Sequence, residues 1–183
     1  MLIYIHGFNS SSQSGKAQEM AAWMAARGQA DEYVCPDLPD RPAAAMALLE
    51  DLVKKHPKAK LIGSSLGGFY ATYLAEKYDM KAILVNPCVH CHKKLAAMLG
   101  STQKNWHTGT EYVFSAEHLQ ALQPLAVTPK RLANYLLLVE TGDEVLDYRE
   151  AVDFYAGARQ VVREGGDHGF SCFTEYLPHI LEF

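Results

Sequence analysis

Short apolar runs alternate along the chain with longer stretches in which apolar residues recur every three or four positions. A run of four to six apolar residues is typical of a buried strand, whereas the wider spacing is typical of an amphipathic helix. The pattern predicts strands at residues 2–5, 32–35, 60–63, 81–85, 135–140 and 158–163. It predicts helices at residues 14–27, 42–56, 66–78, 148–156 and 173–183.

This alternation of strand and helix indicates the fold class. Repeated βα units with nearly all-apolar strands are typical of a parallel sheet with helices on both faces. We therefore expect an α/β fold in which residues 1–183 form one domain around six parallel strands. A domain of this length buries about 70% of the surface that its unfolded chain exposes, so its core needs no further staples.

One stretch, residues 88–133, interrupts this rhythm and is much longer than an ordinary loop. It carries Trp106, Tyr112 and Phe114 and a short helical pattern at residues 115–122. Because long excursions from compact domains usually have a function, we expect a lid-like insert whose three aromatic side chains contact a substrate. The alternative is an amphipathic insert that only covers the edge of the sheet.

The composition narrows the possible partners and location. The net charge is −4 and the basic residues are scattered, so nucleic acid is not an expected partner. No stretch approaches the roughly 20 apolar residues of a membrane span. The first apolar run, residues 2–5, is too short for the apolar part of a signal peptide, so we expect a cytoplasmic protein without a membrane partner.

The four cysteines are expected to be free thiols in a reducing compartment. Cys88 and Cys91, with His90 and His92 beside them, resemble half of a zinc site. Zinc needs about four ligands, and no second pair occurs at a suitable spacing, so we expect no metal and no cofactor. A metal-dependent protein using these residues is the alternative.

The pentapeptide Gly63-Ser64-Ser65-Leu66-Gly67 lies between a predicted strand and a predicted helix. In this context G-x-S-x-G is typical of a nucleophile elbow, a tight turn that exposes the central serine above the sheet. The glycines are required because a Cβ atom at either position would collide with the neighbouring strand or helix. Ser65 is therefore the candidate nucleophile.

Two further candidates follow later strands, Asp143 after residues 135–140 and His168 after residues 158–163. The carboxyl ends of parallel strands meet at one edge of a sheet, so these residues can converge on Ser65. Ser, Asp and His in this order are typical of α/β-hydrolases, where histidine is the base and aspartate orients it. Taken alone, an acid in the position of Asp143 is more often a helix N-cap or a loop carboxylate.

After the first strand, the turn His6-Gly7-Phe8 can direct the Phe8 N–H toward Ser65. Together with the Leu66 N–H, it would form a two-donor oxyanion hole. We expect His6 itself to be structural and to order the loop.

Several motifs together resemble the YqiA-type family of small bacterial esterases, and the similarity extends over essentially the whole chain. They are residues 3–11, 35–39, 62–71, 85–87 and 166–170. The resemblance implies an α/β-hydrolase fold reduced to its parallel core and a carboxylesterase or thioesterase activity on acyl substrates. Ser65, Asp143 and His168 match the triad positions of that family.

The leading hypothesis is therefore a cytoplasmic serine esterase that hydrolyses short to medium acyl esters or acyl thioesters through an acyl-enzyme. If the insert folds over the site, its three aromatic side chains would favour an apolar acyl chain. An acyltransferase or perhydrolase would use the same triad with another acceptor, and a non-catalytic ligand-binding protein could keep the same fold. The sequence leaves the oligomeric state, the natural substrate and the acyl length open.

Overall fold

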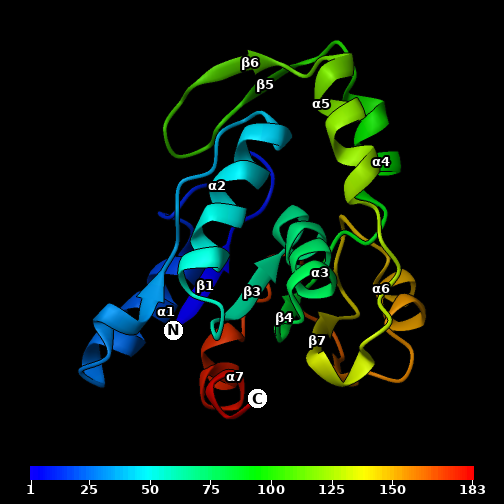
Figure 1. The fold of residues 1–183 in the computed structure, drawn as a ribbon. Coiled ribbons are helices and arrows are strands. Elements are labelled where there is room, and N and C mark those ends of the chain that lie inside the picture. The colour runs from blue at the N-terminus through cyan, green and yellow to red at the C-terminus, as the bar shows by residue number, and fades with distance from the viewer.

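The computed structural model describes all residues, 1–183, and has a six-stranded parallel sheet at its centre (Figure 1). The strand order is β2-β1-β3-β4-β7-β8, and every neighbouring pair is parallel. The predicted fold class is thereby confirmed. The strands are β1 (Leu2–Ile5), β2 (Tyr33–Val34), β3 (Lys60–Ser64), β4 (Ala82–Val85), β7 (Tyr135–Glu140) and β8 (Arg159–Arg163).

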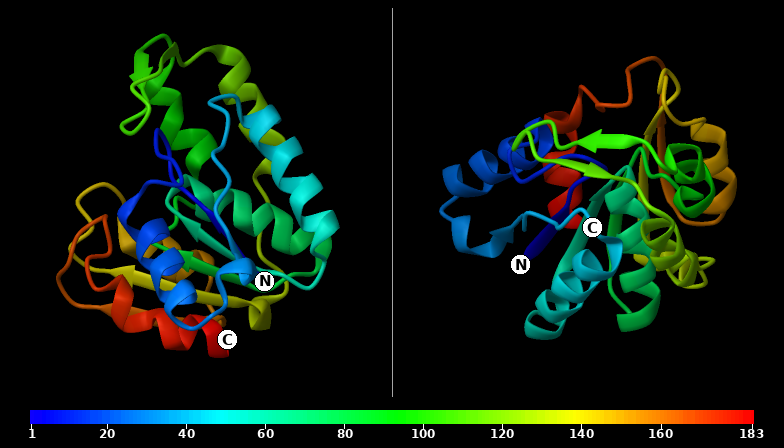
Figure 2. Two further views of the ribbon diagram at one scale, coloured as in Figure 1. Left: turned by 90° about the vertical axis from the view of Figure 1, so that its left-hand side faces the viewer. Right: turned by 90° about the horizontal axis from the view of Figure 1, so that it is seen from above.

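Helices cover both faces of the sheet (Figure 2). They are α1 (Gly15–Ala26), α2 (Pro42–Lys55), α3 (Leu66–Tyr78), α6 (Tyr148–Phe154) and α7 (Leu177–Glu182). Successive strand side chains point to opposite faces, so Ile3 and Ile5 pack with α2, α3 and α6, whereas Leu2 and Tyr4 pack with α1 and α7. Two apolar clusters therefore hold the sheet rigid from both sides.

The strand order places β1 directly beside β3. Because both strands run in the same direction, the loop after β1 and the turn after β3 emerge side by side at the carboxyl edge. The loops after β4, β7 and β8 emerge at the same edge. This edge gathers the candidate residues.

The predicted closing helix at residues 173–183 is divided into two parts. A 3₁₀-helix spans Phe173–Tyr176, and α7 begins only at Leu177. Pro178 lies in the first turn of α7, where its missing N–H costs no hydrogen bond, so it marks a helix start and not a helix interior. The second predicted strand is also shorter than expected, since only Tyr33 and Val34 pair with β1.

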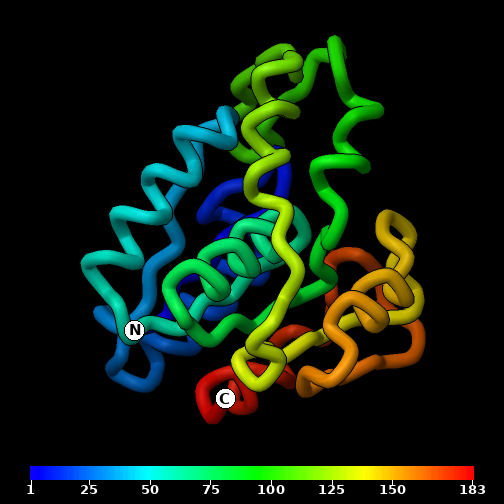
Figure 3. Tube along the Cα trace, turned by 45° about the vertical axis from the view of Figure 1, so that its right-hand side comes forward, coloured from blue at the N-terminus to red at the C-terminus, as the bar shows by residue number.

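Between β4 and β7 the chain leaves the sheet. This insert contains α4 (Cys91–Lys94), a 3₁₀-helix (Leu95–Met98), the antiparallel strands β5 (Thr102–Lys104) and β6 (Glu111–Val113), α5 (Ala116–Leu122) and a 3₁₀-helix (Gln123–Leu125). Figure 3 shows it in green, arching above α3 and away from both termini. The predicted helix is present, whereas the β5–β6 hairpin was not predicted from the sequence.

None of the helices combines the length and the apolar character needed to cross a membrane. All four cysteines are free thiols, as predicted.

Candidate active site

Ser65 forms the whole connection between β3 and α3. Strand β3 ends at Ser64 and α3 begins at Leu66, so the chain reverses its course within one residue. The Ser65 backbone has φ 54° and ψ −119°, a conformation that residues other than glycine rarely adopt. Two hydrogen bonds hold it there, from Ser65 N–H to Val85 O at 3.2 Å and from Cys88 N–H to Ser65 O at 3.0 Å. The turn keeps Ser65 half-buried at the carboxyl edge of the sheet.

The glycines of the elbow are required by the close approach of main chains. A Cβ atom at Gly67 would overlap the carbonyl oxygen of Ile5 on β1. A Cβ atom at Gly63 would overlap the carbonyl group of Gly67. In both cases the obstacle is backbone and not a flexible side chain, so no rotamer change can make room.

The structure brings Ser65, Asp143 and His168 together, although 103 positions separate the serine from the histidine. The Nδ1 atom of His168 lies 2.8 Å from Oδ2 and 3.0 Å from Oδ1 of Asp143. The Nε2 atom of the same ring lies 3.2 Å from Oγ of Ser65. The three side chains therefore form one continuous chain of hydrogen bonds, with the imidazole in the middle.

The Asp143 carboxylate is held in its ionised form. Its side chain is only 2% exposed, and burial alone would raise its pKa. Hydrogen bonds from His168 and from the N–H groups of Val145 and Leu146, at 2.9 and 2.8 Å, outweigh burial and lower the pKa of the carboxyl. Asp143 is therefore a fixed negative charge behind the imidazole.

The loop that carries His168 is fixed by Asn86 at the end of β4. The Asn86 Nδ2 group donates to the carbonyl oxygens of Asp167 at 3.0 Å and His168 at 3.2 Å. Its Oδ1 atom accepts the Glu140 N–H at 3.0 Å. Asn86 therefore ties the ends of β4 and β7 to the histidine loop.

Glu140, the last residue of β7, supports the same loop from below. It is 1% exposed, and its Oε2 atom accepts the Asp167 N–H at 3.0 Å. Glu144 accepts the His168 N–H at 3.0 Å from the other side. The sequence analysis did not identify Asn86 or Glu140 as part of the site. The available signal was a polar residue at the end of an otherwise apolar run.

The other acidic residues of these loops have different contacts. Asp147 caps α6, because its side chain accepts the Arg149 N–H at 3.0 Å. Among the acidic residues of these loops, Asp143 is the one whose carboxylate contacts the imidazole.

The loop after β1 passes directly over Ser65. A Cβ atom at Gly7 would lie 3.2 Å from Cβ of Ser65, so only glycine permits this approach without a shift. Phe8 follows at once, and Leu66 is the first residue of α3, where an N–H has no acceptor within the helix. Phe8 and Leu66 line the same pocket. Their N–H groups are the candidate oxyanion donors.

His6 orders this loop, in agreement with the structural position expected for it. Its Nε2 atom accepts the Leu38 N–H at 3.1 Å, so the ring proton is on Nδ1, which donates to Gly7 O at 3.0 Å. Burial lowers the pKa of the imidazole, which keeps it neutral and able to accept. His6 joins the loop after β1 to the loop after β2.

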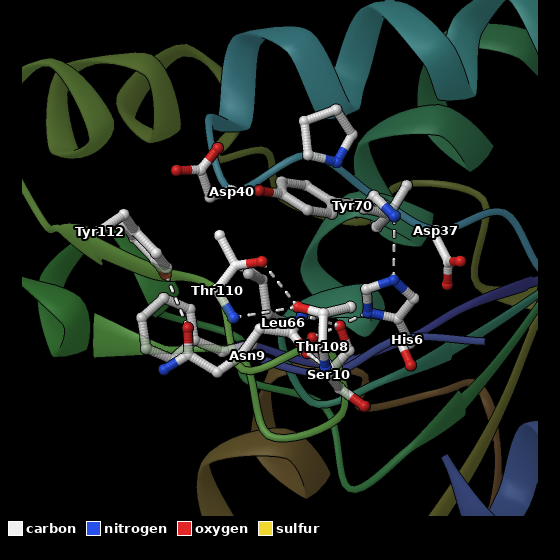
Figure 4. Close-up of a pocket in the computed structure, with 16 residues that line it drawn as sticks. His6, Asn9, Ser10, Asp37, Asp40, Leu66, Tyr70, Thr108, Thr110 and Tyr112 are labelled. Carbon is white, nitrogen blue, oxygen red and sulfur yellow. Dashed lines mark hydrogen bonds between the residues drawn. The ribbon is translucent and has the colours of Figure 1, made fainter. Parts of the chain in front are cut away.

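A pocket of about 310 Å³ opens beside the elbow, between the loops after β1 and β2 and the β5–β6 hairpin (Figure 4). Its volume is in the range of small-molecule sites. Most of the residues that line it carry a polar side chain. They include Asn9, Asp37, Asp40, Thr108, Thr110 and the hydroxyl-bearing rings of Tyr70 and Tyr112.

The three aromatic residues proposed to contact substrate do not form one apolar wall. Trp106 is 74% exposed, and Phe114 is buried at 1% exposure with its ring packed edge-on against Phe8 at 6.0 Å. Only Tyr112 lines the pocket. The expectation of an apolar acyl site built from these side chains loses its basis, because a sequence cannot say which aromatic side chains turn inward.

Hydrogen bonds join the hairpin of the insert to the loop after β1. The Trp106 N–H donates to Asn9 O at 2.9 Å, and the Asn105 side chain donates to Ser10 O at 2.8 Å. The Tyr112 hydroxyl donates to Oδ1 of Asn9 at 2.7 Å. Asn9 has φ 55°, a left-handed conformation that asparagine tolerates better than most residues. The insert therefore forms one wall of the pocket and braces the loop that carries Phe8.

The suspected half-site for zinc has no complement in the fold. No three or more His, Cys, Asp or Glu side chains are grouped so that they could hold a metal ion. Cys88 and Cys91 are buried in the apolar cluster, and His92 stacks on Phe69 at 6.0 Å. These residues pack the base of the insert.

The whole chain, residues 1–183, matches the model of a family described as "Uncharacterised protein family (UPF0227)".

Solved structures with the same architecture extend over nearly the full chain. Alpha/beta hydrolase domain-containing protein 10 from mouse is 13% identical with a TM-score of 0.75, covering 99% of this chain and 87% of its own. Est1E from Butyrivibrio proteoclasticus is 14% identical with a TM-score of 0.71, covering 99% and 86%. A metagenome-derived lipolytic enzyme of the LipS and LipT pair is 15% identical with a TM-score of 0.71, covering 100% and 93%. At these identities the likeness establishes an α/β-hydrolase fold.

Proposed function

Because this chain belongs to the UPF0227 family, the family of the YqiA-type proteins that its motifs resemble, and has an α/β-hydrolase fold, we propose that it is a serine hydrolase of carboxylic esters or thioesters. The observation that supports this most is the hydrogen-bond chain from Asp143 through His168 to Ser65. A serine hydroxyl is a weak nucleophile, and these hydrogen bonds from Asp143 through His168 activate it.

In the first half of the reaction, Oγ of Ser65 attacks the carbonyl carbon of the ester while its proton moves to Nε2 of His168. The separation of 3.2 Å between these atoms suits that transfer. Asp143 accepts the Nδ1 proton in a hydrogen bond, which fixes the tautomer and stabilises the imidazolium. The imidazolium then protonates the departing alcohol or thiol, and the acyl group remains on Ser65.

The N–H groups of Phe8 and Leu66 stabilise the negative charge that develops on the carbonyl oxygen. Loss of one such donor typically costs about 3 to 4 kcal/mol of transition-state stabilisation. In the second half of the reaction, His168 takes a proton from water, and the resulting attack releases the acid from Ser65. An alcohol or peroxide in place of water would make the same site a transferase or perhydrolase. Product analysis with competing alcohols separates these outcomes.

Labelling with a fluorophosphonate probe tests the proposal. We expect the folded wild-type protein to be labelled at Ser65 and to hydrolyse p-nitrophenyl butyrate. Ser65→Ala should lose both the label and at least about 1,000-fold in kcat, as removal of a triad member does. Ser64→Ala, which removes the neighbouring hydroxyl, should retain the label. A folded wild-type protein that stays unlabelled would instead be a binding protein without turnover.

A further inference from the structure

The pocket beside Phe8 and Leu66 has a charge character that ester hydrolysis by itself does not require. Asp37 and Asp40 contribute carboxylates to its wall, and none of the sixteen lining residues is a lysine or arginine. The chemistry of Ser65, His168 and Asp143 uses neither of these two acids. They need another explanation.

Neither carboxylate is neutralised by the protein. Asp37 accepts the Ser12 N–H at 2.7 Å, which lowers the pKa of the carboxyl, but it forms no ion pair. Asp40 forms neither an ion pair nor a hydrogen bond, and the adjacent Arg41 is paired with Glu117 at 3.2 Å. Two carboxylates without a cationic partner in the protein therefore line the pocket.

The Tyr70 side chain also directs a polar group into this pocket. It lies on α3 and is only 2% exposed, yet its hydroxyl makes no hydrogen bond within the protein. The hydroxyl oxygen itself is not buried and is open to solvent on the pocket side. Figure 4 shows the Tyr70 side chain reaching into the pocket with its hydroxyl toward the side where Asp40 lies. The hydroxyl oxygen is therefore directed at whatever occupies the pocket.

Tyr112 closes the same side of the pocket from the hairpin. Burial raises the pKa of this tyrosine to about 12, and the nearby Asp40 carboxylate contributes to the shift. Asp40, Tyr70 and Tyr112 line the same pocket. A carboxylate beside two tyrosines is a setting that suits an ammonium group, since both carboxylates and aromatic faces attract cations.

We propose that this pocket receives an ammonium group of the substrate, carried on either the acyl or the alcohol part of the ester, with Asp40 and Asp37 supplying charge and the Tyr70 hydroxyl supplying a hydrogen-bond acceptor. This assignment rests on the proposed ester hydrolysis and makes its substrate class narrower. An alkylamine titrates near pH 10.4 and is therefore cationic at neutral pH. The same charges repel phosphate and carboxylate groups.

Matched pairs of esters test the assignment on both sides of the bond. On the acyl side the pair is p-nitrophenyl 6-aminohexanoate and p-nitrophenyl 6-hydroxyhexanoate. On the alcohol side it is choline butyrate and 3,3-dimethylbutyl butyrate, which have the same shape and differ in charge. Since both carboxylates are solvent-accessible, we expect kcat/KM to favour the cationic ester of at least one pair by about 3- to 10-fold.

Two variants and one control identify the groups responsible. Asp40→Asn should reduce the ratio of kcat/KM between the cationic and the neutral ester to about 2-fold or less, and Tyr70→Phe should reduce this ratio by a smaller factor. Asp31→Asn makes the same charge change before β2, at the opposite edge of the sheet, and should leave the preference unchanged. The preference should also shrink when the salt concentration rises from 0.05 to 0.5 M.

Equal kcat/KM values within both pairs would overturn the assignment, and so would a preference that persists in Asp40→Asn. If Ser65 is not labelled and none of the four esters is hydrolysed, the proposed function fails instead. In that case calorimetric titration of the wild type and Asp40→Asn with 6-aminohexanamide decides the assignment separately. Binding that weakens in the variant supports it, and absence of binding to the wild type refutes it.

Discussion

The hydroxyl of Tyr112 donates to the carboxamide oxygen of Asn9 at 2.7 Å, across 103 positions of the chain. Asn9 directly follows Phe8, whose N–H is one of the two proposed oxyanion donors. The bond therefore links the hairpin of the insert to the part of the site that must be held most accurately, because oxyanion stabilisation depends on donors fixed in advance.

Tyr112→Phe should reduce kcat for p-nitrophenyl butyrate about 5-fold. One neutral hydrogen bond contributes about 1 kcal/mol, and its loss would let the loop carrying Phe8 move. Tyr33→Phe is the matched control, since it removes a bond of similar length, from the Tyr33 hydroxyl to Ala17 O at 2.9 Å, at the far edge of the sheet. Steady-state kinetics and thermal unfolding of both variants give the comparison. Equal effects of the two substitutions on kcat would contradict a positioning contribution of the insert.

Gly67→Ala should prevent stable folding or lower the melting temperature severely. The added Cβ atom would overlap the Ile5 carbonyl oxygen, and backbone cannot move aside without separating α3 from β1. Gly15→Ala at the start of α1 meets nothing within 4 Å and should be neutral or slightly stabilising. Circular dichroism melts of the two variants measure the difference. A Gly67→Ala protein as stable as wild type would show that α3 and β1 can separate at this point without cost.

Asp143→Asn should reduce kcat by about 1,000- to 10,000-fold and leave the fold intact. The amide keeps the size of the side chain but cannot stabilise the imidazolium or maintain the tautomer with the proton on Nδ1. Asp147→Asn, four residues further on, should keep most of the activity because asparagine caps a helix as well as aspartate does. Measurements of kcat for both variants under the same conditions compare the contributions of the two carboxylates. A larger loss in Asp147→Asn would mean that the orienting acid has been assigned to the wrong residue.

The His6 imidazole should make stability depend on pH below neutrality. Its pKa is lowered by burial, so the unfolded chain binds a proton more readily than the folded one, and the stabilising contribution is complete only above about pH 6.5. As the pH falls from 7 to 5, protonation breaks the bond from the Leu38 N–H to Nε2, and wild type loses stability.

Urea unfolding of wild type and His6→Gln measures this effect. The difference in the free energy of unfolding between them should shrink as the pH is lowered, because glutamine does not titrate. A difference between wild type and His6→Gln that is the same at pH 7 and pH 5 would refute the assignment.

The strands and the elbow were predictable because their causes are local. A run of buried residues such as Tyr135–Glu140 satisfies its backbone N–H and C=O groups in any parallel sheet. The pattern of apolar residues is therefore sufficient to predict the strand. The pair Gly63 and Gly67 around Ser65 carries a steric requirement that depends only on the strand-turn-helix geometry. The order of serine, aspartate and histidine, each after a different strand, is sufficient to place the three side chains at one edge of the sheet.

The conformation and position of the insert depend on tertiary contacts. Strands β5 and β6 have three residues each and alternate between exposed and half-buried positions, so neither forms a recognisable apolar run. Their position depends on hydrogen bonds to Asn9 and Ser10, residues that lie about 90 or more positions earlier in the chain and leave no mark on local periodicity.

The sequence by itself determined the α/β architecture, the exposed serine and the candidate partners of that serine, because close packing and strand order constrain each of them separately. Only the tertiary structure decided that Trp106 faces solvent while Phe114 packs against Phe8, that Asn86 and Glu140 hold the histidine loop, and that the pocket wall is acidic. The physical reason is that the direction of a side chain and the neutralisation of its charge depend on contacts between segments that are distant in sequence. A pattern of apolar positions carries no information about those contacts.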